Sequence, residues 1–364
     1  MFGWGLSLLS AVLMAYVAWR AASVPWLTRK FSNRTLWLVA AILWGVMALG
    51  RMFGHGASFP GSSLLEFIGM TLLGVLFLCF MPLLLVDVVT GFGSWLRNSS
   101  LHFRGWALLV GIGLSGLASV QGLREPEVVD YEVKLQGLPQ ELDGLVMVAL
   151  SDLHLGTTLG PRWLEARVAQ VQDLKPDVVV LLGDVFEGHG RPEGELLKIL
   201  QKLNAPLGVW GVDGNHEQHE IGNSPLNDAG VRVLRDATAM LAPGLMLAGR
   251  SQSTGHGDEN GQPVWAAPIP SPPGAMVLLS HIPKHVQEAA ASGVGLMLSG
   301  HTHGGQIWPF GYLVGKAYPA LDGQSKVGGM TLIINRGTGT WGPRMRLWHR
   351  SEVSRIHLRP GAVR

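Results

Sequence analysis

Five short polar motifs constrain the fold of this chain most, because each one directly follows a short apolar run. The motifs are Ser-Asp-Leu-His at 151–154, Gly-Asp at 183–184, Gly-Asn-His-Glu at 214–217, Ser-His at 280–281 and Gly-His-Thr-His at 300–303. The apolar runs cover 145–150, 178–182, 207–212, 276–279 and 296–298. Runs of this length that are rich in Val and Leu and end at Gly or Ser predict buried strands of an α/β sheet.

The polar residues at the ends of these strands form a candidate metal site. Side chains just past neighbouring strand ends meet at one edge of an open α/β sheet, where such folds bind their ligands. The nitrogen and oxygen donors expected to meet there are Asp152, His154, Asp184, Asn215, His281, His301 and His303. Imidazole combined with carboxylate and amide oxygen suits Mn, Fe or Zn, and the absence of thiolate argues against a closed structural zinc site. An open position for water, as hydrolysis requires, is therefore expected.

The five motifs, in this order, resemble those of the calcineurin-like metallophosphoesterases over roughly residues 128–358. The resemblance implies an α/β fold of two packed mixed sheets flanked by helices, and two divalent ions that activate a shared hydroxide to hydrolyse a phosphoester. It implies one metal held by Asp152, His154, Asp184 and His303, and a second held by Asp184, Asn215, His281 and His301. Asp184 would bridge the two ions.

The resemblance also implies catalytic roles for two residues beside the ligands. His216 matches the family's catalytic histidine, which donates a proton to the leaving oxygen or stabilises charge on the phosphoryl group. Glu187 takes the place of the carboxylate that orients this histidine in the Ser/Thr phosphatase branch, and a solvated loop carboxylate is the equally weighted alternative. The arginine that grips phosphate in that branch is absent, because position 188 is Gly. A protein phosphatase is therefore disfavoured.

The first third of the chain contains four long apolar stretches, at 2–19, 35–53, 64–89 and 103–120. Each is close to the roughly 20 residues needed to cross a bilayer core. No Lys or Arg precedes the first stretch, so it lacks the basic region of a cleaved signal peptide. Four transmembrane helices within 1–123, followed by a phosphoesterase domain at 124–364, are therefore expected.

Basic residues in the short loops predict the orientation in the membrane. The first connection carries Arg20, Arg29, Lys30 and Arg34, and the third carries Arg97 and Arg104, whereas the second carries only Arg51. The first and third loops are thus predicted to be cytoplasmic, which places the catalytic domain outside the cytoplasm after four crossings. Glu66 and Asp87 lie near the ends of the third stretch, where solvation by lipid head groups is expected.

Charge divides along the same boundary. Residues 1–120 hold seven basic and two acidic residues, a net charge of +5, and the remainder carries −3. The catalytic part has no basic stripe interleaved with aromatic residues, so nucleic acid is not an expected partner. The cluster Arg336, Arg344, Arg346 and Arg350 is expected on a solvated strand face, with contact to phosphate or lipid head groups as the alternative.

Further elements follow from local patterns. Residues 128–135 predict a first strand, 163–174 and 195–203 predict amphipathic helices, and 251–274 predicts a long loop rich in Gly, Pro and Ser. Residues 330–335 and 345–358 are expected to add strands to the second sheet. The segment Trp308-Pro-Phe310 follows the last histidine motif and is expected either in the core or on a rim that meets an apolar group.

These observations predict a membrane-anchored, metal-dependent phosphoesterase of the bacterial inner membrane. Its expected partners are the lipid bilayer and a phosphodiester, phosphomonoester or pyrophosphate, expected to be lipid-linked. One alternative is a UDP-2,3-diacylglucosamine pyrophosphatase of lipid A synthesis, but that substrate is made on the cytoplasmic side. Another alternative is a non-catalytic module that binds metal or phospholipid, which the complete donor set with His216 disfavours.

Overall fold

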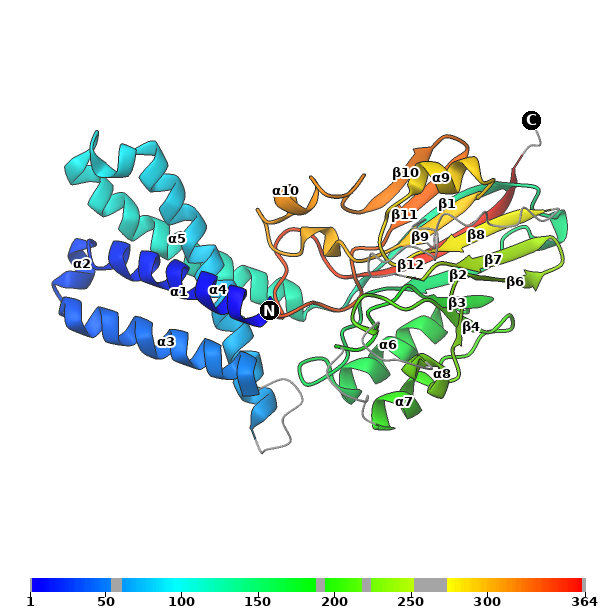
Figure 1. Cartoon of the computed structure of the whole chain (residues 1–364), viewed down its shortest axis with the longest axis horizontal. Coiled ribbons are helices and arrows are strands. Elements are labelled where there is room, and N and C mark those ends of the chain that lie inside the picture. The colour runs from blue at the N-terminus through cyan, green and yellow to red at the C-terminus, as the bar shows by residue number, and fades with distance from the viewer. Residues whose placement is uncertain (1, 54–60, 188–193, 218–223, 252–273, 362–364) are drawn as a thin grey trace, which may run out of the picture. The chain divides into compact units, whose positions relative to one another are not determined.

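A computed structural model describes residues 2–53, 61–187, 194–217, 224–251 and 274–361. It separates into two compact units (Figure 1). We name each unit for what the sequence predicts of it: the membrane unit comprises residues 1–123 together with 342–347, and the catalytic unit comprises 124–341 together with 348–364. The predicted loop at 251–274 lies outside the described residues except for its two ends.

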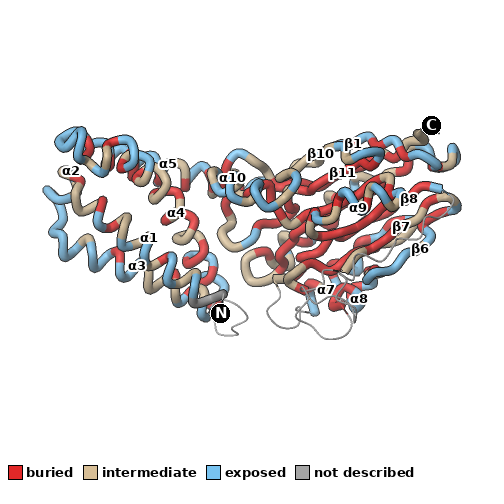
Figure 2. Tube along the Cα trace, turned by 45° about the horizontal axis from the view of Figure 1, so that its top comes forward, coloured by how far each residue is buried: buried red, intermediate tan, exposed pale blue. Residues whose placement is uncertain are grey.

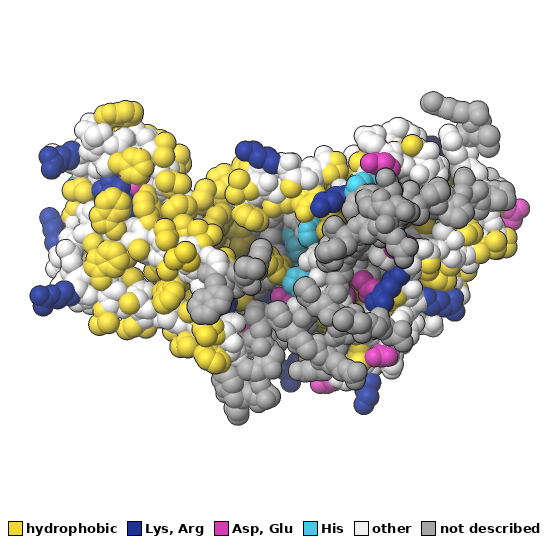
Figure 3. Space-filling model, in the orientation of Figure 1, with side chains coloured by type: hydrophobic (Ala, Val, Ile, Leu, Met, Phe, Trp, Pro, Cys, Tyr) yellow, Lys and Arg dark blue, Asp and Glu magenta, His cyan; other side chains and the backbone are white. Residues whose placement is uncertain are grey.

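The membrane unit is a bundle of four helices at the positions of the four apolar stretches. They are α1 (Phe2–Ala21), α3 (Asn33–Phe53), α4 (Ser62–Val89) and α5 (Arg97–Leu123), with the short helices α2 (Pro25–Thr28) and η1 (Gly91–Gly93) in the connections. Three of them, α3, α4 and α5, are long and apolar enough to cross a membrane, and α1 is somewhat shorter over its described side chains. The face of this unit that Figure 3 shows is largely hydrophobic, with Lys and Arg side chains at one end.

The expectation that Glu66 and Asp87 are solvated by head groups is wrong. Both side chains are buried, with Asp87 fully so. Arg104 Nε donates a hydrogen bond of 2.9 Å to Asp87, Arg20 Nε lies 2.5 Å from the same carboxylate, and the Tyr16 hydroxyl donates to it. The charge is therefore compensated inside the bundle by basic residues from two other helices, as polar groups at membrane depth require.

A short segment from near the C-terminus, 342–347, completes the membrane unit. Its Arg346 main-chain N–H donates to the carbonyl of Ala118 on α5. A Cβ on Gly74 would lie 2.5 Å from Met345 Sδ, and a Cβ on Gly122 would lie 2.5 Å from a main-chain oxygen of the same segment. These two glycines therefore make room for the segment against α4 and α5.

The catalytic unit is built on two six-stranded sheets. The first has the order β1-β12-β2-β3-β4-β5, comprising β1 (Glu127–Gln136), β12 (Glu352–Gly361), β2 (Val146–Leu150), β3 (Val178–Leu181), β4 (Val209–Gly211) and β5 (Arg232–Val233). The second has the order β10-β11-β9-β8-β7-β6, comprising β10 (Gly323–Val327), β11 (Met330–Ile334), β9 (Leu296–Ser299), β8 (Ala275–Leu279), β7 (Leu245–Gly249) and β6 (Ala237–Ala242). Both sheets mix parallel and antiparallel pairs.

Most residues of the central strands of both sheets are buried (Figure 2). In β2, Met147 and Ala149 belong to the core between the two sheets, while Val148 and Leu150 pack with the helices α6 (Pro161–Asp173) and α7 (Gly194–Leu200). In β8, Val277 belongs to the same central core, and its neighbours pack toward α9 (Val286–Ala291). The remaining helical pieces are α8 (Pro225–Asp228), α10 (Gly311–Val314), η2 (Gln140–Leu142) and η5 (His303–Gly305). The predicted α/β fold of two packed mixed sheets flanked by helices is confirmed.

Two expectations about the C-terminal part are wrong. The last strand, β12, lies in the first sheet, where it pairs parallel to β1 and antiparallel to β2, and residues 345–351 form no strand. The arginine cluster is not on a solvated strand face: Arg346 is fully buried, and Arg336 pairs with Glu352 and Glu127 at 2.9 and 2.7 Å.

Candidate metal centre

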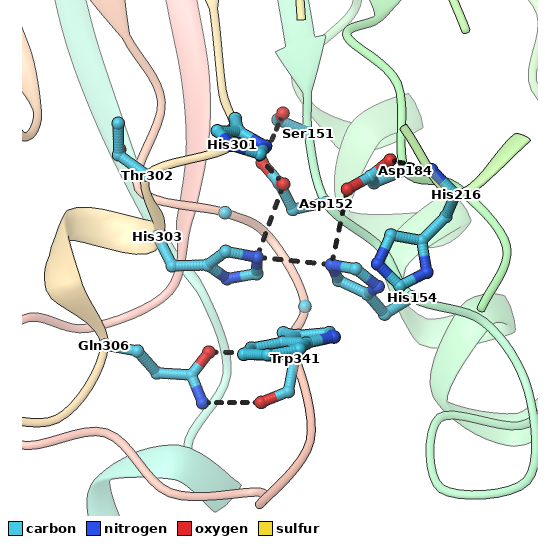
Figure 4. A network of polar contacts seen from close by, with 12 residues as sticks. Ser151, Asp152, His154, Asp184, His216, His301, Thr302, His303, Gln306 and Trp341 are labelled. Carbon is cyan, nitrogen blue, oxygen red and sulfur yellow. Dashed lines mark hydrogen bonds and ion pairs between the residues drawn. The ribbon is translucent and has the colours of Figure 1, made fainter. Parts of the chain in front are cut away.

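The predicted ligands lie on loops that leave strand ends of both sheets. Asp152 and His154 follow β2, Asp184 follows β3, and Asn215 follows β4 in the first sheet. His281 follows β8, while His301 and His303 follow β9 in the second sheet. The expected convergence therefore occurs at the edge shared by two packed sheets and not along one sheet (Figure 4).

The backbone at these ligands is unusual. Eleven described residues other than glycine have a positive φ, and five of them are predicted ligands: Asp152, His154, Asp184, His301 and His303. Asp and His tolerate this left-handed region better than most residues, but it still costs free energy that the surrounding structure must compensate. Such strain is typical of functional sites, because it turns side chains into directions that relaxed strand ends do not give.

Two motif glycines leave room for the carboxylates. A Cβ at Gly214 would lie 2.0 Å from Asp184 Oδ1, and a Cβ at Gly300 would lie 2.5 Å from Asp152 Oδ2. Any other residue would displace the ligand, so the glycines in Gly-Asn-His-Glu and Gly-His-Thr-His are steric requirements of the site.

The first cluster of donors comprises Asp152, His154 and His303, close to Asp184. His154 Nε2 lies 3.2 Å from His303 Nε2, and His303 Nε2 lies 3.3 Å from Asp152 Oδ1. The Asp184 Oδ2 atom is 4.0 Å from His154 Nε2. All of these side chains are buried.

The second cluster comprises Asn215, His281 and His301, and it also includes Asp184. His281 Nε2 lies 3.1 Å from Asp184 Oδ2, 3.2 Å from Asn215 Oδ1 and 3.2 Å from His301 Nδ1. The other ring nitrogen of His281 lies 2.7 Å from the carbonyl of Leu182, so Nδ1 donates to that carbonyl and Nε2 faces the cluster. Asp184 is therefore common to both clusters.

The chemistry and spacing of these donors suit divalent cations. Ligand atoms about 2.1 Å from a metal are separated from one another by roughly 3.0–3.4 Å, depending on coordination geometry. The closest donor separations here, 3.1–3.3 Å, fall in this range. Facing imidazole nitrogens also repel unless a proton or a metal lies between them. Histidine nitrogens with carboxylate and amide oxygens suit Mn, Fe or Zn.

Burial and neighbouring charges shift the pKa values of the side chains in both clusters. Burial alone lowers the pKa of His154 and His281, but the nearby carboxylates outweigh it and raise these pKa values to about 9 and about 10. Burial lowers the pKa of His301 to about 4, and the charge of His281 adds to this effect. Burial also raises the pKa of Asp152 and Asp184, yet the facing imidazoles outweigh it and hold both below the usual range. Both carboxylates are therefore ionised.

The predicted catalytic residues lie beside this cluster. The main-chain N–H of His216 donates to Asp184 Oδ1 at 2.9 Å, and its ring contacts the His154 ring edge to face at 4.8 Å. Nδ1 of His216 lies 2.9 Å from the main-chain carbonyl of Glu187. With that nitrogen protonated as a donor, Nε2 is the ring nitrogen that is left free of this contact.

The side chain of Glu187 lies elsewhere than the resemblance implied. Its Oε2 atom is 3.0 Å from Nδ1 of the predicted ligand His154, while His216 is held by the main-chain oxygen of Glu187. A carboxylate behind a metal-binding imidazole fixes the ring and increases its basicity. Glu187 therefore supports both histidines, one through its carboxylate and one through its backbone.

Sequence analysis gave no role to Glu217, the last residue of the Gly-Asn-His-Glu motif. This buried carboxylate accepts hydrogen bonds from the main-chain N–H groups of Asp184 at 2.9 Å, Phe186 at 3.0 Å and Gly214 at 2.7 Å. It joins the loop after β3 to the loop after β4. Its place in the motif was the one signal in the sequence. Its partners are main-chain N–H groups, and two of them lie 31 and 33 residues away.

Tyr318 was also missed. Its hydroxyl lies 2.8 Å from Nε2 of His301, and the two rings meet edge to face at 5.5 Å. His301 thus directs Nδ1 toward the second cluster and Nε2 toward Tyr318. No sequence signal marks this residue, because it lies 15 residues beyond the last motif in a connection after α10.

Figure 3 shows histidine side chains gathered at one place on the catalytic unit, with acidic side chains beside them.

The Trp308 and Phe310 side chains are about 45% exposed, which excludes the core alternative for this segment and leaves the rim. Figure 4 shows the polar network from Asp184 through His154 and His303 to Asp152.

Comparison with known proteins agrees with this geometry. The calcineurin-like phosphoesterase family model matches residues 145–305. Proteins named "transmembrane protein with metallophosphoesterase domain" from Danio rerio and Bos taurus are each 30% identical, over 70% and 69% of this chain and 62% and 61% of their own length. An uncharacterized metallophosphoesterase of Aquifex aeolicus is 34% identical over 60% of this chain and 87% of its own.

The chain thus spans less than two thirds of the length of the two vertebrate relatives. Its match to the Aquifex aeolicus protein extends over nearly all of that relative. With the family model, these similarities establish that the chain belongs to the calcineurin-like phosphoesterase family.

Proposed function

We propose that this protein is a membrane-anchored phosphoesterase with a dinuclear metal centre, whose substrate is a lipid-linked phosphoester or pyrophosphate outside the cytoplasm. The observation that carries the dinuclear centre is the sharing of Asp184 between two donor clusters. Its Oδ2 atom lies 3.1 Å from His281 Nε2 and 4.0 Å from His154 Nε2. One carboxylate thus faces both candidate metal positions.

Asp184, His216, Glu187 and Glu217 have distinct roles in the proposed hydrolysis. When bound, a pair of divalent cations lowers the pKa of water and neutralises charge on a phosphoryl group. Asp184 holds its place because Glu217 fixes its main chain and the His216 N–H donates to its Oδ1 atom. His216 Nε2 then donates a proton to the leaving oxygen or stabilises phosphoryl charge, while Glu187 holds the ring through its main-chain carbonyl.

The membrane link supports a substrate at the bilayer. Helix α5 ends at Leu123 and β1 begins at Glu127, so three residues separate the last membrane helix from the first strand of the catalytic unit. A domain on so short a connection samples phosphoesters held in the membrane at high effective concentration. The basic residues of the first and third loops support an extracytoplasmic catalytic unit in a bacterial inner membrane.

Asp184→Asn tests the dinuclear centre. The variant loses the shared negative charge, so metal content and hydrolysis of an aryl phosphodiester should fall together, with activity reduced by at least about 100-fold. The measurements are metals per chain by mass spectrometry and turnover of the full-length protein in detergent. Asp228→Asn, the same change on the exposed end of α8, serves as control. Two metals per chain with full turnover in Asp184→Asn would show that the assignment is wrong.

Single cysteines test the orientation. In a Cys79→Ser background, Ser63→Cys and Ser99→Cys place exposed thiols at the starts of α4 and α5, which are predicted on opposite sides of the membrane. An impermeant maleimide on intact cells should label the first and not the second. The reverse pattern would place the catalytic unit in the cytoplasm and would favour the lipid A precursor as substrate.

A further inference from the structure

Exposed apolar side chains of the catalytic unit are concentrated in two segments. Among its described residues, seven large hydrophobic side chains are exposed, and six of them lie at 308–313 or at 341 and 348. We call these six the aromatic rim: Trp308, Phe310, Tyr312, Leu313, Trp341 and Trp348. The seventh, Met240, is on β6. Scattered exposed hydrophobic residues are ordinary on a soluble surface, but a concentration of this kind marks an interaction site.

The aromatic rim adjoins the metal centre along the chain and through hydrogen bonds. Residues 308–313 follow directly after η5, which begins at the ligand His303. Gln306 joins the two segments: its Nε2 donates to the Trp341 carbonyl at 2.9 Å, and its Oε1 accepts from the Trp341 N–H at 3.0 Å (Figure 4). Just before Trp341, the N–H of Gly339 donates to the carbonyl of Asp152. A ligand on the rim is therefore close to the ligand loops.

The rim is also continuous with the membrane unit. Trp341 and Trp348 are the residues at which the chain leaves and re-enters the catalytic unit, and the six residues between them belong to the membrane unit. That segment is anchored by the hydrogen bond from Arg346 to Ala118. Trp341 and Trp348 are each one peptide bond away from this segment. Their Cα atoms therefore lie about 3.8 Å from the Cα atoms of residues that belong to the membrane unit.

We propose that the aromatic rim contacts the lipid bilayer and lies at the interface between its head groups and acyl chains. Trp and Tyr prefer this zone because they combine an apolar ring with a polar group, while Phe and Leu suit the acyl region below it. Exposed Lys316, just after α10, adds a positive charge that suits lipid phosphates. A phosphoester head group then reaches the metal centre while its acyl chains stay in the membrane.

Site-directed spin labelling tests the contact itself. In full-length Cys79→Ser protein, Leu313→Cys and Met240→Cys give a matched pair, since the native side chains are 62% and 67% exposed on the same unit. Each is labelled with a nitroxide in vesicles of phosphatidylcholine and phosphatidylglycerol. We expect the label at 313 to be accessible to oxygen and shielded from a water-soluble nickel complex, and the label at 240 to show the opposite pattern.

Two results would overturn the proposal. Equal accessibility of both labels to the nickel complex would show that the rim faces water. A label at 313 that is shielded from both reagents would show a protein contact, either with another chain or with a second copy. Neither result depends on catalysis, so the contact can fail while the proposed dinuclear phosphoesterase stands.

The consequence for substrate rests on the proposed function and has its own test. Phe310→Ser combined with Leu313→Ser removes two apolar side chains from the rim. The ratio of kcat/KM for a lipid phosphoester in vesicles to kcat/KM for bis(p-nitrophenyl) phosphate should fall about tenfold or more, since burial of each side chain contributes to binding at the bilayer. An unchanged ratio would overturn lipid presentation by the rim. If the wild-type protein hydrolysed neither substrate, the result would instead count against the proposed function.

Discussion

Glu217 offers the sharpest test of how the centre is held, because its carboxylate accepts three main-chain hydrogen bonds inside the protein. Glu217→Gln keeps the shape of the side chain but only one of its two acceptor oxygens. If that oxygen takes the place of Oε2, the bonds from Asp184 and Gly214 remain, and the new amide nitrogen faces the N–H of Phe186. Two donors then meet where a donor and an acceptor met before.

The magnitude follows from these bonds. A hydrogen bond to a charged acceptor contributes about 1.5–3 kcal/mol, and a buried N–H left unpaired costs about 1–3 kcal/mol more. Burial raises the pKa of Glu217, so removing its charge recovers part of this loss. We expect the free energy of unfolding to fall by about 2–4 kcal/mol. For a domain of this size that corresponds to a Tm lower by roughly 5–10 °C.

Two measurements check this expectation on the full-length protein in detergent. Differential scanning fluorimetry gives the Tm, and hydrogen exchange followed by mass spectrometry should show faster exchange in peptides that contain Asp184 and Phe186. Glu165→Gln is the control, since Glu165 makes an exposed ion pair with Lys202 on the same unit and should change neither quantity. A Glu217→Gln protein with the Tm and exchange rates of the wild type would refute the assigned role.

Three further predictions concern chemistry at the centre. His216→Ala should retain metal but lose about 10²- to 10⁴-fold in turnover, least for esters whose leaving group needs no proton, and an equal loss across leaving groups would exclude general acid catalysis. Tyr318→Phe should weaken metal binding by about 10- to 100-fold in isothermal titration calorimetry, as loss of a partner behind a ligand does; unchanged affinity would refute its role. Because the pKa values of His154 and His281 are raised to about 9 and about 10, both are protonated at pH 7 and must release protons to bind metal. Metal affinity should therefore rise with pH up to about pH 9 to 10. Calorimetry in buffers of different ionisation enthalpy measures the protons released on binding. The absence of proton release at pH 7 would contradict this prediction.

Local sequence pattern was sufficient for most of the fold. The Val- and Leu-rich runs before the motifs predicted β2, β3, β4, β8 and β9 to within a few residues, because strands buried on both faces have a continuous apolar signature. The same pattern does not say which sheet a strand joins. The C-terminal strand β12 was assigned to the wrong sheet, since its pairing with β1 joins residues more than 200 positions apart.

The site shows the same division. The sequence predicted which side chains would lie together at the site, because each follows a strand and strand ends converge. Glu217 accepts hydrogen bonds from main-chain N–H groups, and the Tyr318 hydroxyl contacts the ring of His301. The spacing of residues in the sequence predicts neither contact. Asp87 was expected at a solvated helix end because its partners Arg20 and Arg104 lie on other helices. Long-range pairing of charges is a property of the packed bundle and not of any single span.

The placement of residues 342–347 in the membrane unit has a consequence for biosynthesis. Helices α1 to α5 leave the ribosome first, yet the segment that fills the space at Gly74 and Gly122 follows roughly 220 residues later, a delay of about 10–45 s at typical synthesis rates. β12, which lies between β1 and β2, is synthesised after that segment. Until residues 342–347 and β12 are made, the membrane unit and the first sheet each lack a part, so termination between α5 and β12 should leave a chain that proteases cleave faster than the full-length protein.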